Sequence, residues 1–147
     1  MRVLVQEAPF DLAEEAARFA KGEGASGAIV TFTGVVRDND AGTLSAMEIE
    51  HYPGMTEKAL REIAEQAVAR FDLQDALVIH RYGRLAPGEQ IMMVASAARH
   101  RRHAFEAAEF LMDYLKSRAP FWKREITAEG EAWVAAKDED EAALERW

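Results

Sequence analysis

Residues 99–125 read RHRRHAFEAAEFLMDYLKSRAPFWKRE and carry the clearest structural signals in the chain. Small and apolar residues recur at helical spacing while acidic residues take the other face, which predicts an amphipathic helix over about 99–117. Pro120 should end this helix, because proline disfavours helical geometry in the residue before it. Residues 121–127 are then expected to be extended, so the two halves of this stretch form different elements.

Two lysines, Lys116 and Lys123, lie on either side of the predicted break. In a continuous helix they would be about two turns, or roughly 10.5 Å, apart on one face. A break at Pro120 allows the chain to fold back and bring both ammonium groups into one pocket. Lys116 follows Met112 by four residues, which predicts a position at the margin of the buried face, where partial desolvation lowers a lysine pKa. Alternatively, Lys116 pairs with Asp113 or extends from the core into solvent.

The same stretch is basic within an acidic protein. It holds seven Lys and Arg against four Asp and Glu, a local net charge of +3, whereas the whole chain of 147 residues carries −8. A cationic cleft on an acidic body attracts a small anion, while the surrounding surface repels nucleic acid and anionic membranes. The charge pattern therefore predicts a focused anion site.

Basic residues also crowd the start of the predicted helix. Cations at a helix N-terminus oppose the helix dipole, at a cost of about 0.3–1 kcal/mol each where exposed. If an anion docks at the free backbone N–H groups, with His100 and Arg101 reaching it, this end becomes a phosphate or carboxylate cradle. The spacing leaves a second interpretation open, in which the helix starts later and Arg99, Arg102 and their neighbours form a solvated loop.

The rest of the chain mixes predicted strands and helices within one domain, residues 1–147. Asp11 is a candidate helix cap, and Arg37 stands at a strand end. Pro87-Gly88 is predicted to form the turn of a hairpin between the strands at 76–82 and 90–96. The predicted strands are a short one at Val3 and Val5, then 28–36, 44–52, 76–82 and 90–96; the predicted helices carry apolar positions over 12–20 and 60–71.

Composition excludes several kinds of chemistry. Zero cysteines rule out disulfides, thiolate metal sites and a cysteine-bound persulfide, so any sulfur must come from outside the chain. The histidines are scattered without a metal-ligand spacing, so neither a metal nor a cofactor is expected. Gly22-x-Gly24-x-x-Gly27 follows a predicted helix and precedes a strand, the reverse of a dinucleotide-binding unit. With no run of about 18 apolar residues, the chain is expected to be soluble and cytoplasmic.

Five linked motifs cover nearly the whole chain. They are TFTGVVR (31–37), EHYPGMTEKAL (50–60), IHRYGRLAPGE (79–89), HRRHAFEA (100–107) and MDYLKSRAPFWKRE (112–125). Together they resemble the large, catalytic subunit of molybdopterin synthase. The resemblance implies an α+β fold, a single compact domain of the α/β-hammerhead type with a mixed or antiparallel sheet packed with helices. It also implies a homodimer in which each copy binds one small ubiquitin-like sulfur carrier, giving a heterotetramer.

The same resemblance implies the reaction. Sulfur would pass from the C-terminal Gly-Gly thiocarboxylate of the carrier to cyclic pyranopterin monophosphate, also called precursor Z. Two such transfers build the dithiolene of molybdopterin, a step of molybdenum cofactor biosynthesis. The absence of cysteines fits a sulfurtransferase whose sulfur arrives on a separate polypeptide.

Matching motifs imply which residues act. Lys116 would line the place where the carrier's tail meets substrate, and Lys123 would act nearby as acid/base or electrostatic partner. Lys137 aligns loosely with a basic position that reaches the neighbouring subunit's site. The residues implied to bind or shape the substrate site are Arg37, His100, Arg101, Val35, Val36, Arg124 and Glu125.

Two rival hypotheses use the same cations. A non-catalytic scaffold would bind a ubiquitin-like partner and a phosphorylated ligand without promoting chemistry, and it would tolerate replacement of Lys116. A nucleotide-phosphate hydrolase would need a metal held by carboxylates, so chelators would abolish its activity.

Overall fold

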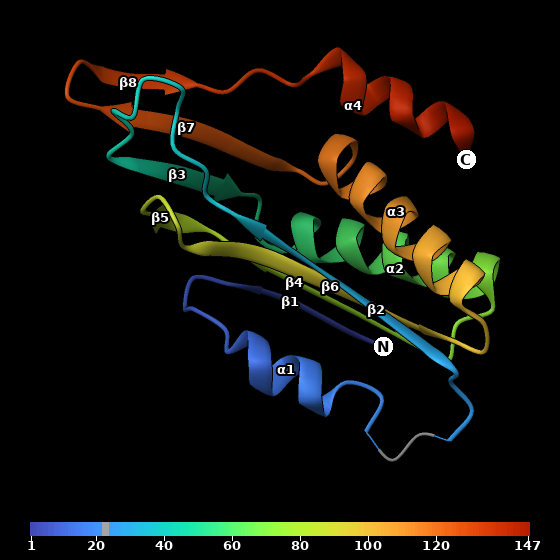
Figure 1. Cartoon of the computed structure of the whole chain (residues 1–147). Coiled ribbons are helices and arrows are strands. Elements are labelled where there is room, and N and C mark those ends of the chain that lie inside the picture. The colour runs from blue at the N-terminus through green and yellow to red at the C-terminus, as the bar shows by residue number, and fades with distance from the viewer. Residues whose placement is uncertain (22–23) are drawn as a thin grey trace.

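The computed structural model describes residues 1–21 and 24–147, which form two four-stranded sheets and flanking helices (Figure 1). Gly22, the first glycine of the Gly22-x-Gly24-x-x-Gly27 pattern, lies outside the described residues. The order in the first sheet is β1-β4-β6-β2, with β1 parallel to β4 and the other pairs antiparallel. Its strands are β1 (Arg2–Gln6), β4 (Asp75–Arg81), β6 (Gln90–Ala98) and β2 (Ala28–Val35). The antiparallel pairing predicted for 76–82 and 90–96 is confirmed.

The second sheet is entirely antiparallel, in the order β5-β3-β7-β8. Its strands are β5 (Gly83–Leu85), β3 (Ala46–His51), β7 (Phe121–Thr127) and β8 (Gly130–Trp133). The extended segment predicted after Pro120 is therefore confirmed as β7. The α+β class is confirmed as well, with the strands arranged in two sheets, and the segment between β4 and β6 contributes β5 to the second one.

Helices cover both faces of the first sheet (Figure 1). One face carries α1 (Leu12–Arg18), whose predicted cap is confirmed because Asp11 accepts a 2.9 Å hydrogen bond from the Glu14 N–H. The other face carries α2 (Met55–Phe71) and α3 (Arg101–Ser117). Near the C-terminus, α4 (Asp138–Ala143) and a 3₁₀ turn (Leu144–Arg146) follow.

The middle strands of the first sheet are buried on both faces. Val78 packs with α2 and α3, whereas Leu77 and Ile79 pack on the α1 side, as expected where successive side chains of a strand alternate between faces. Strands covered on both faces read as continuous apolar runs, which explains why β4 and β6 are rich in apolar residues throughout.

Among the described residues, no helix combines the length and hydropathy needed to cross a membrane.

Polar contacts fasten the C-terminal segment to α3. The carboxylate of Asp113 accepts hydrogen bonds from Arg146 at 2.7 Å and from the indole Nε1 of Trp147 at 2.6 Å. Arg118 and Glu141 form an ion pair at 2.8 Å. These contacts hold α4 beside the C-terminal end of α3, where the candidate site lies.

Candidate functional site

The N-terminal end of α3 is exposed and uncapped. The helix begins at Arg101, with His100 in an extended N-cap conformation that makes no side-chain capping bond. The structure thus decides between the two interpretations of this segment, because the helix starts among the basic residues and not after them. Uncapped backbone N–H groups next to exposed cations form the geometry of an anion cradle.

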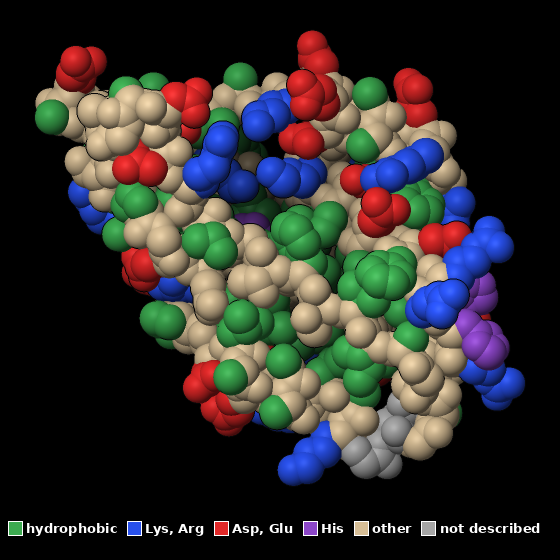
Figure 2. Space-filling view, viewed as in Figure 1, with side chains coloured by type: hydrophobic (Ala, Val, Ile, Leu, Met, Phe, Trp, Pro, Cys, Tyr) green, Lys and Arg blue, Asp and Glu red, His purple; other side chains and the backbone are tan. Residues whose placement is uncertain are grey.

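The C-terminal end of α3 meets β7 in a second basic cluster. Lys116 lies in the last turn of α3, Lys123 lies on β7, and the charges of Lys116 and Lys137 both lower the pKa of Lys123. The three ammonium groups therefore face one region. Figure 2 shows Lys and Arg side chains around a hollow over β3 and β7, beside the C-terminal end of α3. We call the cluster of Lys116, Lys123 and Lys137 the lysine hollow.

Burial singles out Lys123 within the lysine hollow. Its pKa is lowered first by burial and then by Lys116 and Lys137, while Asp140 opposes the shift. Lys123 pairs in register with Ile49, which is 1 % exposed, so its side chain leaves β7 on the face that turns inward. Lys116, by contrast, is exposed, so the partial burial expected for it is wrong. Desolvation falls instead on the lysine of the strand.

The two basic ends of α3 do not meet within one chain. Arg101 and Lys116 are the first and next-to-last residues of the helix, which places them about 22 Å apart along its axis. His100 is one residue further from the lysine hollow. One copy of the chain therefore brings Lys116 and Lys123 together but leaves His100 and Arg101 at a distance.

Alternation along β7 separates Arg124 from its neighbours. Lys123 and Glu125 point to one face of the strand and Arg124 to the other. There Arg124 forms ion pairs with Glu50 and Glu131, both at 2.9 Å, and lies over the ring of Trp133. Arg124 thus lies outside the lysine hollow and is engaged with its own sheet.

The end of β2 carries the remaining residues of the motif. Arg37 is exposed two positions beyond the strand, Val35 is 48 % exposed, and Val36 is buried. The Val36 N–H donates to the Glu89 carbonyl at 2.9 Å, and its own carbonyl accepts from the Gly88 N–H at 2.8 Å. The turn before β6 therefore holds the strand end that presents Arg37.

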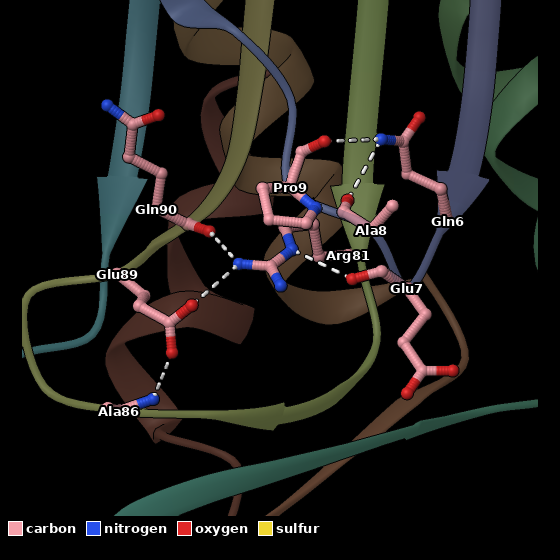
Figure 3. A network of polar contacts seen from close by, with 8 residues as sticks. All are labelled: Gln6, Glu7, Ala8, Pro9, Arg81, Ala86, Glu89 and Gln90. Atoms are coloured by element: carbon pink, nitrogen blue, oxygen red, sulfur yellow. Dashed lines mark hydrogen bonds and ion pairs between the residues drawn. The ribbon is translucent and has the colours of Figure 1, made fainter.

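That turn is braced by a buried arginine (Figure 3). Arg81 donates to the carbonyls of Glu7 at 3.0 Å and Gln90 at 3.2 Å, and to the Glu89 carboxylate at 3.4 Å. Glu89 also accepts a 2.6 Å bond from the Ala86 N–H, which is the main reason that its pKa is lowered. The network ties the end of β1 to the turn that positions Val36.

Residue spacing in the sequence does not identify two groups, Lys137 of the lysine hollow and His80 beside it. Lys137 was placed only by loose alignment, and the structure puts it beside Lys123 of the same chain. His80 on β4 carried no motif of its own. It is buried and lies close enough to Lys123 for that charge to act on it. No sequence signal links His80 to Lys123, because their proximity arises from packing between the two sheets.

In the described part of the chain, no group of three or more His, Cys, Asp or Glu could hold a metal ion.

Solved structures share this architecture. The MoaE molybdopterin biosynthesis protein of Burkholderia ambifaria aligns with a TM-score of 0.84 and 50% identity, covering 99% of this chain and 96% of that one. Molybdopterin synthase from Staphylococcus aureus aligns with a TM-score of 0.82 and 29% identity over 90% of this chain and 96% of that one. The fold is thus that of the molybdopterin biosynthesis proteins.

Sequence comparisons identify the family. Residues 5–118 match the family model described as MoaE protein. The chain is 69% identical over 147 residues, 100% of both chains, to the molybdopterin synthase catalytic subunit of Cereibacter sphaeroides. It is 58% identical over 146 residues to that of Ralstonia nicotianae, covering 99% of this chain and 83% of the relative. The chain belongs to the MoaE family of molybdopterin synthase catalytic subunits, sulfurtransferase enzymes of molybdenum cofactor biosynthesis. Membership in a family of catalytic subunits disfavours the scaffold hypothesis.

Proposed function

We propose that the lysine hollow is where sulfur passes from the C-terminal thiocarboxylate of a small ubiquitin-like carrier to cyclic pyranopterin monophosphate. Two transfers build the dithiolene of molybdopterin, and the proposal places the reaction in the cytoplasm. One observation carries it: within the described residues, none of the three lysines of the hollow forms an ion pair. Like charges gathered without fixed partners favour an anion supplied from outside.

The proposed roles follow from burial. Lys116, exposed at the end of α3, contacts the carrier's tail and the substrate beside it. Lys123, desolvated on β7, stabilises the negative charge that develops on the leaving oxygen, or exchanges a proton there. Binding of the tail excludes water, which strengthens both electrostatic interactions. It also converts an encounter between three components into an oriented one.

The exposed end of α3 has a role in this proposal only if two copies of the chain associate. In a two-fold symmetric dimer with antiparallel α3 helices, His100 and Arg101 of one copy lie beside the lysine hollow of the other. They would hold the substrate phosphate there, with Arg37 contributing from the end of β2. Phe105 on α3 and Phe32 on β2 are 59 % and 43 % exposed, as expected for residues of a protein interface. With one carrier per copy, the assembly is a heterotetramer.

The remaining motif residues shape the site from a distance. Val35 and Val36 set the direction of the chain at Arg37, and Glu125 shares the face of β7 that carries Lys123. Arg124 stabilises the opposite face through its pairs with Glu50 and Glu131. We therefore expect replacement of Arg124 to affect the sheet before it affects substrate binding.

Replacing Lys116 by alanine tests the proposal. The variant is mixed with thiocarboxylated carrier and pterin substrate, and the dithiolene product is followed. Because Lys116 is exposed, the variant should keep its fold and its complex with the carrier but lose most sulfur transfer. Unchanged turnover in an intact complex would contradict the proposed site.

A further inference from the structure

Thr56 is a polar residue in the interior of the molecule. It stands in the first turn of α2, within the motif at 50–60, and it is fully buried. Its Oγ1 accepts a 2.9 Å hydrogen bond from the backbone N–H of Tyr52. The same oxygen lies 3.0 Å from the carbonyl oxygen of Pro120, 64 positions further along the chain. Because a carbonyl only accepts, the Thr56 hydroxyl donates its proton to Pro120.

The two bonds of this hydroxyl lie where β3 and β7 stop pairing. His51, the last residue of β3, lies opposite Phe121, the first residue of β7. The same register would next bring Tyr52 opposite Pro120, which has no N–H to continue the ladder. The Thr56 hydroxyl instead bridges the Tyr52 N–H and the Pro120 carbonyl. It thereby fastens the start of α2 to the turn between α3 and β7.

The turn at Pro120 decides how two lysines of the lysine hollow are placed. Lys116 lies four residues before Pro120, in the last turn of α3, and Lys123 lies three residues after it, on β7. In the described part of the chain, neither ammonium group is held by an ion pair. Their relative position therefore depends on the backbone that carries them, and Thr56 anchors the middle of that backbone.

We propose that Thr56 is a positioning residue of the lysine hollow, whose hydroxyl holds the Pro120 carbonyl and thereby sets the placement of Lys116 relative to Lys123. The inference rests on the proposed function of the lysine hollow. Because Thr56 is fully buried, it does not contact a ligand itself and acts through the turn. Burial also makes the contact hard to replace, since a buried N–H or carbonyl that loses its partner is costly.

Three substitutions separate the hydroxyl from side-chain shape and from general stability. Thr56→Val keeps the branched shape but leaves the Tyr52 N–H and the Pro120 carbonyl without their partner. Thr56→Ser keeps the hydroxyl and loses one methyl group. Ser96→Ala is the matched control, because Ser96 is equally buried and donates a 2.7 Å bond to the Ala104 carbonyl, near the other end of α3.

The first measurement needs neither carrier nor substrate. The side chain of Lys123 is titrated by NMR in ¹³C-lysine-labelled protein, with its signal assigned by Lys123→Arg. Burial and the charge of Lys116 both lower the Lys123 pKa, so a loosened turn should raise it toward 10.5 in Thr56→Val but not in Thr56→Ser. Ser96→Ala should lower Tm without moving this titration. An unchanged titration in folded Thr56→Val, or an equal shift in Ser96→Ala, would overturn the inference.

The second measurement stands even if Thr56→Val fails to fold. Hydrogen exchange of the wild type should show a protected amide at Tyr52, because its N–H is bonded to a buried hydroxyl. Thr56→Ser should keep this protection. Rapid exchange of the Tyr52 amide in the folded wild type would show that the bridge is absent and would overturn the inference.

The third measurement is sulfur transfer by the same variants with the carrier present. We expect kcat to fall about tenfold or more in Thr56→Val with little change in KM, because misplaced reacting groups slow the chemical step. Thr56→Ser should recover most of the rate. A shifted titration with unchanged kcat would overturn the positioning role. If the wild type itself transfers no sulfur, the proposed function fails, while the NMR titration still decides whether Thr56 places the two lysines.

Discussion

The two ends of α3 are both basic, but their basic side chains differ in burial. At the N-terminal end, His100 and Arg101 are exposed beside uncapped backbone N–H groups. At the C-terminal end, Lys123 is half-buried on β7, and its pKa is lowered by that burial and by Lys116. The two ends of α3 thus differ in burial more than in the number of charges. The exposed end is suited to binding an anion, and the partly buried end is suited to catalysing a reaction.

The buried end carries an energetic cost that the exposed end avoids. The half-buried Lys123 is repelled by Lys116 and Lys137, and its partial burial weakens the screening of these charges by solvent. A bound anion would relieve this repulsion, so the lysine hollow is prepared for a ligand. The exposed end needs no such relief, because water already solvates its cations.

The largest expected effect comes from removing a lysine of the hollow. Lys123→Ala should reduce single-turnover sulfur transfer about 100-fold or more, because it removes a desolvated charge from the reacting atoms. Complex formation with the carrier, followed by size-exclusion chromatography, should be preserved. If Lys123→Ala keeps most activity while Arg101→Ala loses it, the assignment of chemistry to the buried end is wrong.

The next effect tests whether the two ends meet between copies. Lys116→Ala and Arg101→Ala should each be nearly inactive alone. Mixed and allowed to exchange subunits, they should recover about a quarter of wild-type activity, since half of the dimers pair the two variants and each such dimer has one intact site. No recovery, in a mixture shown by mass spectrometry to have exchanged, would contradict the shared site.

A third prediction concerns the backbone that carries the exposed end. A Cβ added at Gly27 would meet the carbonyl oxygen of Arg99, so Gly27→Ala must displace the turn that leads into α3. We expect a loss of about 1–3 kcal/mol in the free energy of unfolding, measured by urea denaturation. Gly24→Ala is the matched control, because nothing lies within 4 Å of its added Cβ. Equal stability of the two variants would argue against a close approach at Gly27.

A smaller effect concerns pH and the buried lysine. Because folding lowers the Lys123 pKa below its ordinary value of 10.5, the unfolded chain binds more protons between the two values. The destabilisation is therefore complete below the lowered pKa and disappears as the pH rises toward 10.5. Lys123→Met should have a higher Tm than wild type at neutral pH, and calorimetry should show the difference narrowing with rising pH. A difference that stays constant would show that Lys123 is not desolvated.

The smallest effect is expected one residue from the cradle. Arg102 is exposed, and its one ion pair among the described residues is with Glu106, across one helical turn at 2.9 Å. Arg102→Ala should leave sulfur transfer and Tm nearly unchanged, because exposed ion pairs contribute little. A strong loss of activity would extend the substrate contacts of the exposed end to Arg102.

Local rules predicted much of the fold. The period of α3 and the stop at Pro120 depend on neighbouring residues, as does the Asp11 cap of α1. The edge strands of the second sheet are β5, which is three residues long, and β8, whose side chains are all exposed. In neither strand does the sequence show a residue pattern that would distinguish a strand from a loop.

The candidate site was predictable only in part. Its basic composition and the break at Pro120 could be predicted from neighbouring residues, and Lys116 lies near enough to Lys123 for its charge to lower the Lys123 pKa. Helix periodicity predicts partial burial of Lys116, but it carries no information about where the sheets end, and the structure leaves Lys116 exposed. His80 was missed for a related reason, since its proximity to Lys123 is set by the stack on Phe121 between two sheets.

The most direct test of the account is to find where the carrier's tail lies. A carrier with a photo-crosslinking group in place of its C-terminal glycine is bound to the protein and irradiated, and the linked peptides are identified by mass spectrometry. The account predicts links to the segment that contains Lys116 and Lys123. Links confined to α1 or β8, with the complex intact, would contradict it.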